Sequence, residues 1–282
     1  MPDEAASGAT ALGYSLGHLT LLDEPPPELV RIAAEAGYDY VSIRSIYMGL
    51  PGEHKYDLAG YRSMREDTRQ ALADNGIRLH DIELARVCLE REPSTYAESF
   101  EVAAELGARA VLSSIWMPDR DLYLRRFEEV CRLADRAGLF VGLEYVPIAA
   151  VNTLPLAVDV LRTVAAPNAG LMLDMYHANW AHTDPLALDE LPREWFRFTQ
   201  ICGATTVIPD DIEEVRHELR EDRLLVSEGD VDIRTLLDRL PPMVYSIELP
   251  NLDRTRAMGP IAYARRCLED AKSFLAAPKV PS

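Results

Sequence analysis

The stretch GLMLDMYHANW, residues 170–180, begins with apolar residues suited to a buried β-strand, and that run ends at Asp174. A carboxylate at the end of a buried strand is costly to desolvate unless a cation, a proton or a hydrogen-bond network compensates it. His177 follows three residues further on. The stretch therefore implies a compensating partner for Asp174 elsewhere in the chain.

Strand-like runs of this kind alternate with helical patterns from residue 12 to residue 276. Eight such runs occur, and they read LGYSLGHL, YDYVSIRSI, IRLHDIEL, ARAVLSSIW, LFVGLEYV, AGLMLDMY, FRFTQICG and MVYSIELP. The segments between them carry apolar residues at helical spacing, for example Tyr123, Phe127, Val130 and Ala134. Eight strand–helix units predict a single α/β domain, a closed (β/α)8 TIM barrel, with an open doubly wound sheet as the alternative. We expect residues 1–11 and 277–282 to be tails outside the barrel.

The composition argues against two classes of partner. The 282 residues include 46 acidic and 29 basic side chains, which give a formal net charge of −17. Such a field repels nucleic acid and anionic membrane surfaces, so neither is an expected partner. The chain has no apolar leader, no run of roughly 18 apolar residues and no CxxC pair. We therefore expect a cytoplasmic protein with reduced cysteines.

Four oxygen-bearing side chains occupy matching positions in the last four strands. Side chains alternate between the two faces of a strand, so Phe140 and Glu144 share one face of FVGLEYV. The same phase in the next three strands selects Asp174, Gln200 and Glu248, each near the C-terminal end of its strand. We assign this face to the barrel interior, where the four ends should converge.

Three carboxylates and an amide at one mouth would repel one another if left alone, but they form the hard oxygen shell that a divalent cation prefers. Any one of these acids could instead cap a helix or pair with an arginine. Four in phase on successive strands favour a metal site. The predicted ligands are Glu144, Asp174, Gln200 and Glu248, and the all-oxygen shell favours Mn²⁺ or Mg²⁺ over Co²⁺ or Zn²⁺.

The residues around these positions resemble a known family, the xylose-isomerase-like barrels of the sugar phosphate isomerase/epimerase group. The resemblance spans nearly the whole chain, and its motifs are GLEYV with Glu144, LMLDMYH with Asp174 and His177, FTQIC with Gln200, and SIELPN with Glu248. It implies the same four metal ligands, and it implies that His177 contacts a substrate oxygen beside the metal. It also gives Glu144 and Glu248 the roles of base and acid.

This resemblance implies a divalent-metal-dependent isomerase or epimerase that acts on a sugar, keto-sugar or cyclitol through a metal-stabilised enediolate. The first alternative is a lyase of the 3-dehydroshikimate dehydratase type, in which the same intermediate expels a β-hydroxyl group. The second is a catalytically silent metal- or ligand-binding barrel. Gln200 occurs in isomerase-like and in dehydratase-like members and does not choose between them. The expected partner is a polyhydroxylated small molecule, and a homo-oligomer is compatible with this group of barrels.

Several polar residues near other strand ends are candidates for binding the substrate. Arg44 and Arg86 could bind a carboxylate or phosphate, although a lone arginine near a strand end often pairs with an acidic neighbour. Glu83 is expected beside the metal ligands, and His18 lies on a loop predicted at the same face. Trp116 could supply an apolar wall, but core packing is the interpretation that we favour.

The seventh strand is followed by ATTVIPDDIEEVRHELREDRLLVSEG before the next expected helix. This connection is much longer than the usual 2 to about 6 residues of a strand-to-helix loop. Long loops of this type commonly form part of the active-site mouth in barrels. Within it, DDIEEVRHELRED predicts a solvated helix.

Overall fold

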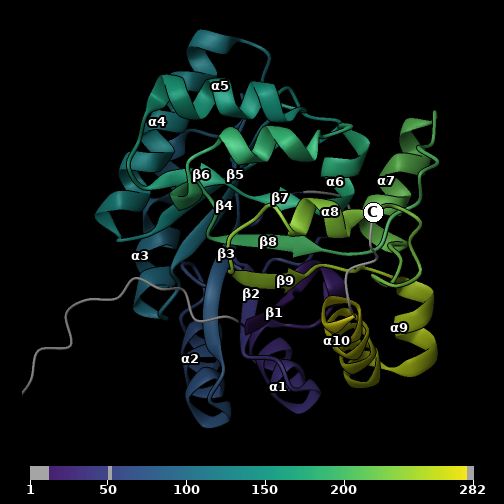
Figure 1. Ribbon diagram of the computed structural model, residues 1–282. Coiled ribbons are helices and arrows are strands. Elements are labelled where there is room, and N and C mark those ends of the chain that lie inside the picture. The colour runs from purple at the N-terminus through teal and green to yellow at the C-terminus, as the bar shows by residue number, and fades with distance from the viewer. Residues whose placement is uncertain (1–12, 50–52, 278–282) are drawn as a thin grey trace, which may run out of the picture.

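The computed structural model describes residues 13–49 and 53–277. Within them, nine parallel strands form one nearly closed barrel (Figure 1). The strands are β1 (Gly13–Gly17), β2 (Tyr40–Arg44), β3 (Arg78–Val87), β4 (Ala110–Ile115), β5 (Phe140–Glu144), β6 (Ala169–Leu171), β7 (Leu173–Asp174), β8 (Phe198–Ile201) and β9 (Val244–Ile247). The predicted TIM barrel is confirmed. The expected tails lie outside the described residues, except for Ala277.

The order of hydrogen-bonded strands shows how the barrel closes. It runs β6-β5-β4-β3-β2-β1-β9-β8-β7, so β6 and β7 stand at its two ends. These two strands are consecutive in the chain and are separated only by Met172. They are therefore the two halves of the predicted sixth strand, the first paired with β5 and the second with β8. The open-sheet alternative is wrong, because this interrupted strand joins both edges.

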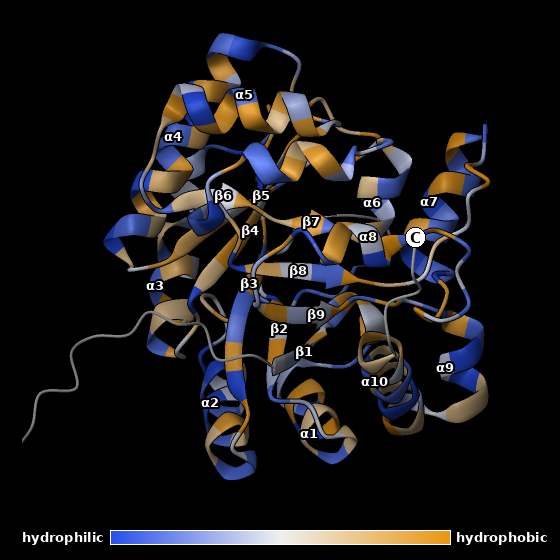
Figure 2. Ribbon diagram, viewed as in Figure 1, coloured by the Kyte–Doolittle hydropathy of each residue, from blue (hydrophilic) through white to orange (hydrophobic). Residues whose placement is uncertain are grey.

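Helices follow the strands and cover the outside of the barrel (Figure 1). They are α1 (Pro26–Ala36), α2 (Arg62–Asn75), α3 (Ala97–Glu105), α4 (Arg120–Arg136), α5 (Leu154–Val164), α6 (Met175–Trp180), α7 (Ile212–Glu221), α8 (Ile233–Leu237), α9 (Leu252–Met258) and α10 (Pro260–Ala276). Figure 2 shows apolar stripes on these helices beside polar ones. Gly37 and Gly76 end α1 and α2 in the left-handed conformation, with φ of 94° and 65°.

One expected helix is absent from the described residues after β7. The segment DPLALDELPREW forms two 3-10 turns, Pro185–Glu190 and Arg193–Trp195, where the sequence pattern predicts a longer helix. Pro192 lies between them, and proline cannot donate the backbone hydrogen bond that would continue a helix. The other 3-10 turns are His18–Leu21 and Pro93–Tyr96.

The interior of the barrel holds its own apolar cluster, separate from the larger core under the helices. Phe140, Met172, Phe198 and Val244 belong to this cluster, together with Tyr40, Leu84, Ala110 and Leu112. The first four share the strand face that the sequence assigns to the interior, so that assignment is confirmed. Gly142 lies on the same face, where an added Cβ would come within 3.0 Å of the Phe198 ring. A larger residue at this position would displace that ring.

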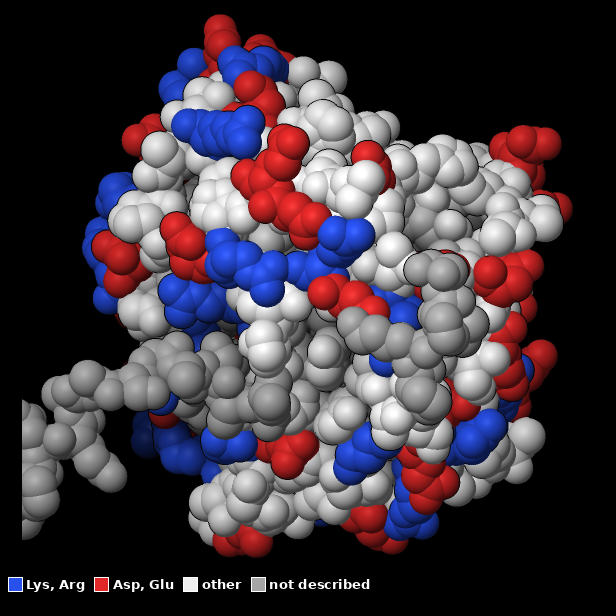
Figure 3. Space-filling model, in the orientation of Figure 1, with Lys and Arg blue, Asp and Glu red and all other residues white. Residues whose placement is uncertain are grey.

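The molecular surface mixes charges of both signs on the face shown in Figure 3. No helix in the described part of the chain is long and apolar enough to cross a membrane.

Candidate active site

The C-terminal ends of four strands bring the predicted metal ligands together. Glu144 ends β5, Asp174 ends β7, Gln200 lies in β8 and Glu248 directly follows β9. Register places Gln200 beside Asp174 on one side and beside Ser246 on the other. All four ligand candidates are buried. The ends converge because parallel strands in phase carry their interior side chains to one mouth.

His177 lies next to two of these carboxylates. It belongs to α6, which begins directly after Asp174, and its Nε2 lies 3.5 Å from Glu144 Oε1 and 3.8 Å from Asp174 Oδ2. One potential ligand atom from each of these three residues lies within 4.8 Å of the other two. Burial lowers the pKa of His177 to about 4, so its imidazole is neutral near pH 7. A neutral imidazole can bind a cation or a substrate oxygen.

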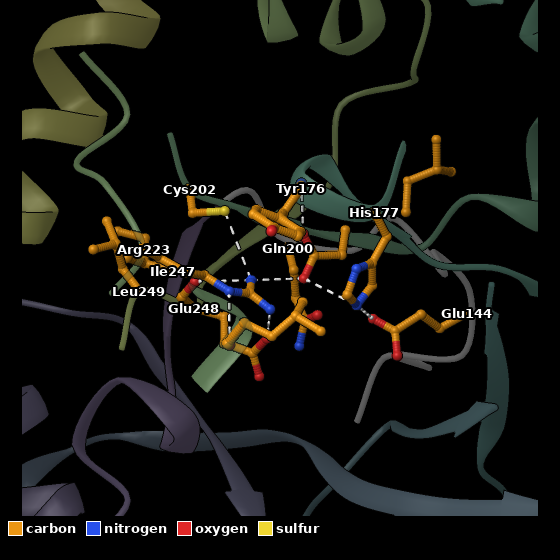
Figure 4. Close-up of polar contacts among 12 residues, drawn as sticks. Glu144, Tyr176, His177, Gln200, Cys202, Arg223, Ile247, Glu248 and Leu249 are labelled. Atoms are coloured by element: carbon orange, nitrogen blue, oxygen red, sulfur yellow. Dashed lines mark hydrogen bonds and ion pairs between the residues drawn. The ribbon is translucent and has the colours of Figure 1, made fainter. Parts of the chain in front are cut away.

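Arg223 compensates Asp174 within the described chain. Its Nη1 donates to Asp174 Oδ2 at 2.7 Å and to the Glu248 carbonyl oxygen at 3.2 Å, while its Nη2 lies 3.3 Å from Glu248 Oε2. Its Nε donates to the Leu219 carbonyl oxygen at 3.2 Å. Figure 4 shows Arg223 entering from the side opposite Glu144. The Arg223 guanidinium is therefore the compensating partner that the sequence implies for Asp174.

Arg223 does not stand out in the sequence, because it lies among other charged residues in the long connection after β8. Nothing in the local pattern separates it from the exposed arginines of α7. Only its burial distinguishes it, since its side chain is 2% exposed. The sequence signal that could have found Arg223 is its place in the long connection, because such connections commonly contribute to a barrel mouth.

Several polar atoms at the mouth have no partner in the described residues. Gln200 Oε1, Glu248 Oε1 and His177 Nδ1 are buried without a hydrogen bond. Glu83 sets the orientation of the amide, because its Oε1 accepts from Gln200 Nε2 at 3.2 Å. This leaves Gln200 Oε1 free to bind a ligand. Buried polar atoms are rarely left unpaired, so these three point to a missing ligand.

The electrostatics of the carboxylates follow from burial and from Arg223. Burial raises the pKa of Glu144 well above its usual value, and the charge of Asp174 raises it further. Burial also raises the pKa of Glu248. Burial alone would raise the pKa of Asp174, but the Arg223 guanidinium holds it below its usual range. A positive ion among these groups would favour their ionised forms.

The donor set fits a divalent cation. Glu144, Asp174 and Glu248 supply carboxylate oxygens, Gln200 supplies an unpaired amide oxygen, and His177 is close enough to add a nitrogen. Oxygen-rich sites of this type suit Mg²⁺ and Mn²⁺, and added imidazole suits Zn²⁺. Arg223 competes with a cation for Asp174 Oδ2 and Glu248 Oε2. The residues present could therefore hold a divalent metal ion.

Not all of the predicted substrate-binding residues reach the site. A hollow at the mouth is lined by Glu144, His177, Gln200 and Glu248, and Arg44 and Arg86 line it as well. The Arg44 Nε donates to Glu83 Oε2 at 3.0 Å. Glu83 itself is fully buried and accepts a hydrogen bond from Gln200, so it positions one of the predicted metal ligands. His18 is not among the residues that line the hollow. Its Nε2 contacts the Glu24 carbonyl oxygen, and its Nδ1 contacts the Arg44 backbone amide.

The long connection after β8 forms part of the mouth, in agreement with its length. Its helix α7 contributes Leu219 and Arg220 to the hollow, and Arg223 follows shortly after. Tyr176 of α6 donates through its hydroxyl to Glu218 Oε2 at 2.6 Å and so ties α7 to the barrel. Trp116 also lines the hollow, which agrees with the alternative of an apolar wall and not with the favoured core packing.

Sequence comparison identifies a family and two curated relatives. A family model described as xylose isomerase-like TIM barrel matches residues 30–270. A 3-dehydroshikimate dehydratase of Pseudomonas aeruginosa is 29% identical over 204 residues, which are 68% of this chain and 31% of that protein. A 3-dehydroshikimate dehydratase of Pseudomonas putida is 26% identical over 224 residues, 75% of this chain and 33% of that protein. The chain thus spans about a third of the length of these relatives.

Solved structures share the fold. A xylose isomerase-like TIM barrel/4-hydroxyphenylpyruvate dioxygenase fusion protein superposes with a TM-score of 0.75 at 22% identity, covering 96% of this chain and 45% of that one. The IolI protein with a bound zinc atom gives 0.70 at 19% identity, covering 94% and 100% of the two chains. D-Allulose 3-epimerase from Methylomonas sp. in complex with D-allulose gives 0.67 at 18% identity, covering 93% and 96%.

Proposed function

Since the chain belongs to the xylose isomerase-like TIM barrel family, we propose that it is a divalent-metal-dependent enzyme that removes the proton beside the carbonyl group of a polyhydroxylated ketone. We further propose that the reaction is completed by loss of a β-hydroxyl group as water, which makes the protein a dehydratase.

The main support for the proposal is the group of unpaired oxygens at the converging strand ends. Gln200 Oε1 and Glu248 Oε1 are buried without partners beside the cluster of Glu144, Asp174 and His177. A divalent cation held there would act as a Lewis acid that polarises the substrate carbonyl group. The preference for elimination comes from the two curated relatives, both of which are 3-dehydroshikimate dehydratases.

The residues of the chain have distinct roles in this proposal. One of Glu144 and Glu248 takes the proton from carbon, and the electron pair of the broken C–H bond forms the new double bond. The C–O bond to the β-hydroxyl group breaks, and the other carboxyl group donates the proton that releases water. His177, neutral above its pKa of about 4, orients a substrate oxygen by hydrogen bonding. Burial of all three groups excludes water from the reacting centre.

An isomerase or epimerase is the second candidate, and one observation favours it. Glu144 and the Arg223–Glu248 pair approach the centre from opposite sides (Figure 4). Two carboxyl groups on opposite sides of one carbon can remove a proton from one face and return it to the other. This arrangement suits inversion of configuration at that carbon, or movement of the carbonyl group to the neighbouring carbon, without loss of water.

An NMR experiment in deuterated water tests the proposal. The protein loaded with Mg²⁺ or Mn²⁺ is incubated separately with a keto-sugar panel, with inososes and with 3-dehydroshikimate, and metal-loaded Glu144→Gln serves as the control. We expect 3-dehydroshikimate to lose water and give 3,4-dihydroxybenzoate. Deuterium incorporation with a new stereoisomer or a moved carbonyl would instead select the isomerase or epimerase. Metal binding with neither outcome on any compound would refute the proposed reaction and leave a binding barrel.

A further inference from the structure

We propose that the substrate carries a carboxylate group and that Arg86 of β3 and Arg220 of α7 bind this group at the mouth of the site. The inference rests on the proposed metal-dependent reaction and names the class of its substrate. Both arginines line the same hollow as Glu144, His177, Gln200 and Glu248.

The four arginines of this hollow fall into two pairs with different environments. Arg44 donates to Glu83, and Arg223 donates to Asp174 and contacts Glu248. Within the described residues, Arg86 and Arg220 form no ion pair with a carboxylate. Arg86 Nε is buried without any hydrogen-bond partner. Two arginines are thus committed to the protein's own acids, and two are left for a ligand.

The Arg86 guanidinium is held in place without using its hydrogen bonds. It lies over the Trp116 ring at 4.2 Å from the ring centroid, and the Trp116 Nε1 donates to Ser114 Oγ at 2.8 Å. Stacking fixes the plane of a guanidinium and leaves its edge free for two parallel hydrogen bonds to a planar carboxylate. Burial lowers the pKa of Arg86, and the charges of Arg44 and Arg220 lower it further, so a nearby anion would relieve this repulsion.

Arg220 of α7 is the second arginine of the proposed carboxylate site. It belongs to the last turn of α7, and its side chain is exposed at the rim of the hollow. The hydrogen bond from Tyr176 to Glu218 and the buried Arg223 hold the chain on either side of it. Its neighbour on the same helix, Arg216, pairs with Glu213 and does not line the hollow. Arg220 and Arg216 are therefore a matched pair on one helix, the first inside the proposed site and the second outside it.

The ion pairs at the mouth leave Arg86 and Arg220 as the two arginines of the hollow without a carboxylate partner among the described residues. Arg44 and Arg223 contact the acids Glu83, Asp174 and Glu248. A divalent cation held by these carboxylates would take up part of their negative charge. A neutral sugar would leave Arg86 and Arg220 unpaired, whereas a carboxylated substrate could pair with both.

Calorimetric titration of the metal-loaded protein with two probes tests this inference. Quinate carries a carboxylate on a polyhydroxylated ring, and its neutral carboxamide has the same ring and hydroxyl groups. We expect wild-type protein to bind quinate more tightly. Arg86→Gln and Arg220→Gln should each weaken quinate binding by about ten- to hundredfold, as expected for a lost charge-assisted hydrogen bond, and should leave carboxamide binding unchanged.

Arg216→Gln is the matched control on α7 and should bind both probes as the wild type does. Arg86→Lys keeps the charge without the flat fork and should recover only part of the quinate affinity. Metal content and melting temperature are measured for every variant, so that a misfolded or empty protein is recognised. Equal binding of the two probes, or equal losses in Arg86→Gln, Arg220→Gln and Arg216→Gln, would overturn the inference. Stronger competition against quinate by inorganic phosphate than by acetate would overturn the assignment to a carboxylate.

These outcomes are separable from those of the proposed reaction, because the titration does not depend on turnover. Arginine-dependent binding of quinate without proton exchange on any compound would refute the reaction alone. Equally fast exchange of the carboxylated 3-dehydroshikimate by wild-type protein, by Arg86→Gln and by Arg220→Gln would refute the carboxylate site alone.

Discussion

Glu144 and Glu248 combine two tasks in the proposed mechanism, since each offers oxygens to a cation and each is a candidate for proton transfer. Gln200 can perform only the first task, because an amide does not take up a proton near neutral pH. The three residues lie at equivalent strand ends. Their substitutions therefore separate holding the cation from moving the proton.

We expect Gln200→His to keep the metal and much of the activity, because imidazole is also a metal ligand. Glu144→Gln and Glu248→Gln should lower turnover by about 10² to 10⁴, the usual loss for a missing general acid or base. Turnover and metal content are measured on the same preparations, since an empty mutant says nothing about proton transfer. Near-normal turnover of both metal-loaded glutamine variants would limit the glutamates to holding the cation and would move the base to His177 or Glu83.

Arg223 acts as an internal cation for the same cluster. Arg223→Gln leaves the buried Asp174 without its partner, and breaking a buried ion pair costs about 3 to 5 kcal/mol. We therefore expect a large drop in the melting temperature of the metal-free protein. We also expect added Mg²⁺ or Mn²⁺ to raise that temperature more in the variant than in the wild type, because a cation then replaces the lost charge.

Arg254→Gln is the control for this experiment. Its ion pair with Glu228 is about one-third exposed on both sides, so its loss should cost less than about 1 kcal/mol and should leave the metal response unchanged. A metal response of Arg223→Gln equal to that of the wild type would show that the guanidinium does not share the cation's carboxylates.

Among the elements, α7 lines the mouth and buries few side chains. Its buried side chains are Val215 and Leu219, whereas α4 buries six side chains under the barrel wall. Each helix begins with an aspartate whose side chain accepts backbone hydrogen bonds, Asp211 for α7 and Asp119 for α4. The same chemical change can therefore be made at a functional and at a structural helix.

Asp211→Ala removes the cap of α7, a change that costs about 1 kcal/mol of helix stability. We expect faster amide hydrogen exchange over residues 212–221 and a raised KM, with little change in melting temperature, because α7 can open without unfolding the barrel. Asp119→Ala should have the opposite profile, with a lower melting temperature and an unchanged KM. A fall in melting temperature for Asp211→Ala as large as that for Asp119→Ala would show that α7 unfolds only with the barrel.

In the whole molecule, the buried acids of the mouth couple stability to pH. Burial, with the charge of Glu248, raises the pKa of Glu83 to about 8, while the pKa of this residue in the unfolded chain stays near its ordinary value. Between about pH 6.5 and 8 the folded state therefore holds a proton that the unfolded state has lost, and folding is disfavoured as the pH rises. His177 and His18, with pKa values of about 4, act in the opposite direction only below about pH 6.5.

We accordingly expect the melting temperature of chelator-treated protein to fall as the pH rises from about 6.5 to 8. Mg²⁺ or Mn²⁺ should remove this fall, because a cation favours the ionised carboxylates and binds them more tightly at higher pH. Scanning fluorimetry with and without metal measures both effects. A melting temperature of the metal-free protein that is flat or rises over this range would contradict the raised pKa of Glu83.

Much of this architecture could be predicted from local patterns. The barrel follows from eight repeated strand–helix units, and the interior face follows from the alternation that puts Phe140, Phe198 and Val244 in one cluster. The convergence of Glu144, Asp174, Gln200 and Glu248 follows from the same phase, because strands in one parallel barrel end at one mouth. Each inference needs only residue spacing along a strand or helix.

The environment of these residues depended on the tertiary structure. Arg223 reaches Asp174 across 49 positions of sequence, and Gln200 contacts Glu83 across 117. Such contacts depend on the paths of connections such as the one between β8 and α8, which carry no regular period from which a position could be read. Local periodicity thus determined which side chains face the mouth. Chain folding over long separations decided that Arg223 contacts both Asp174 and Glu248, and that Arg86 and Arg220 stay without a carboxylate partner in the described chain.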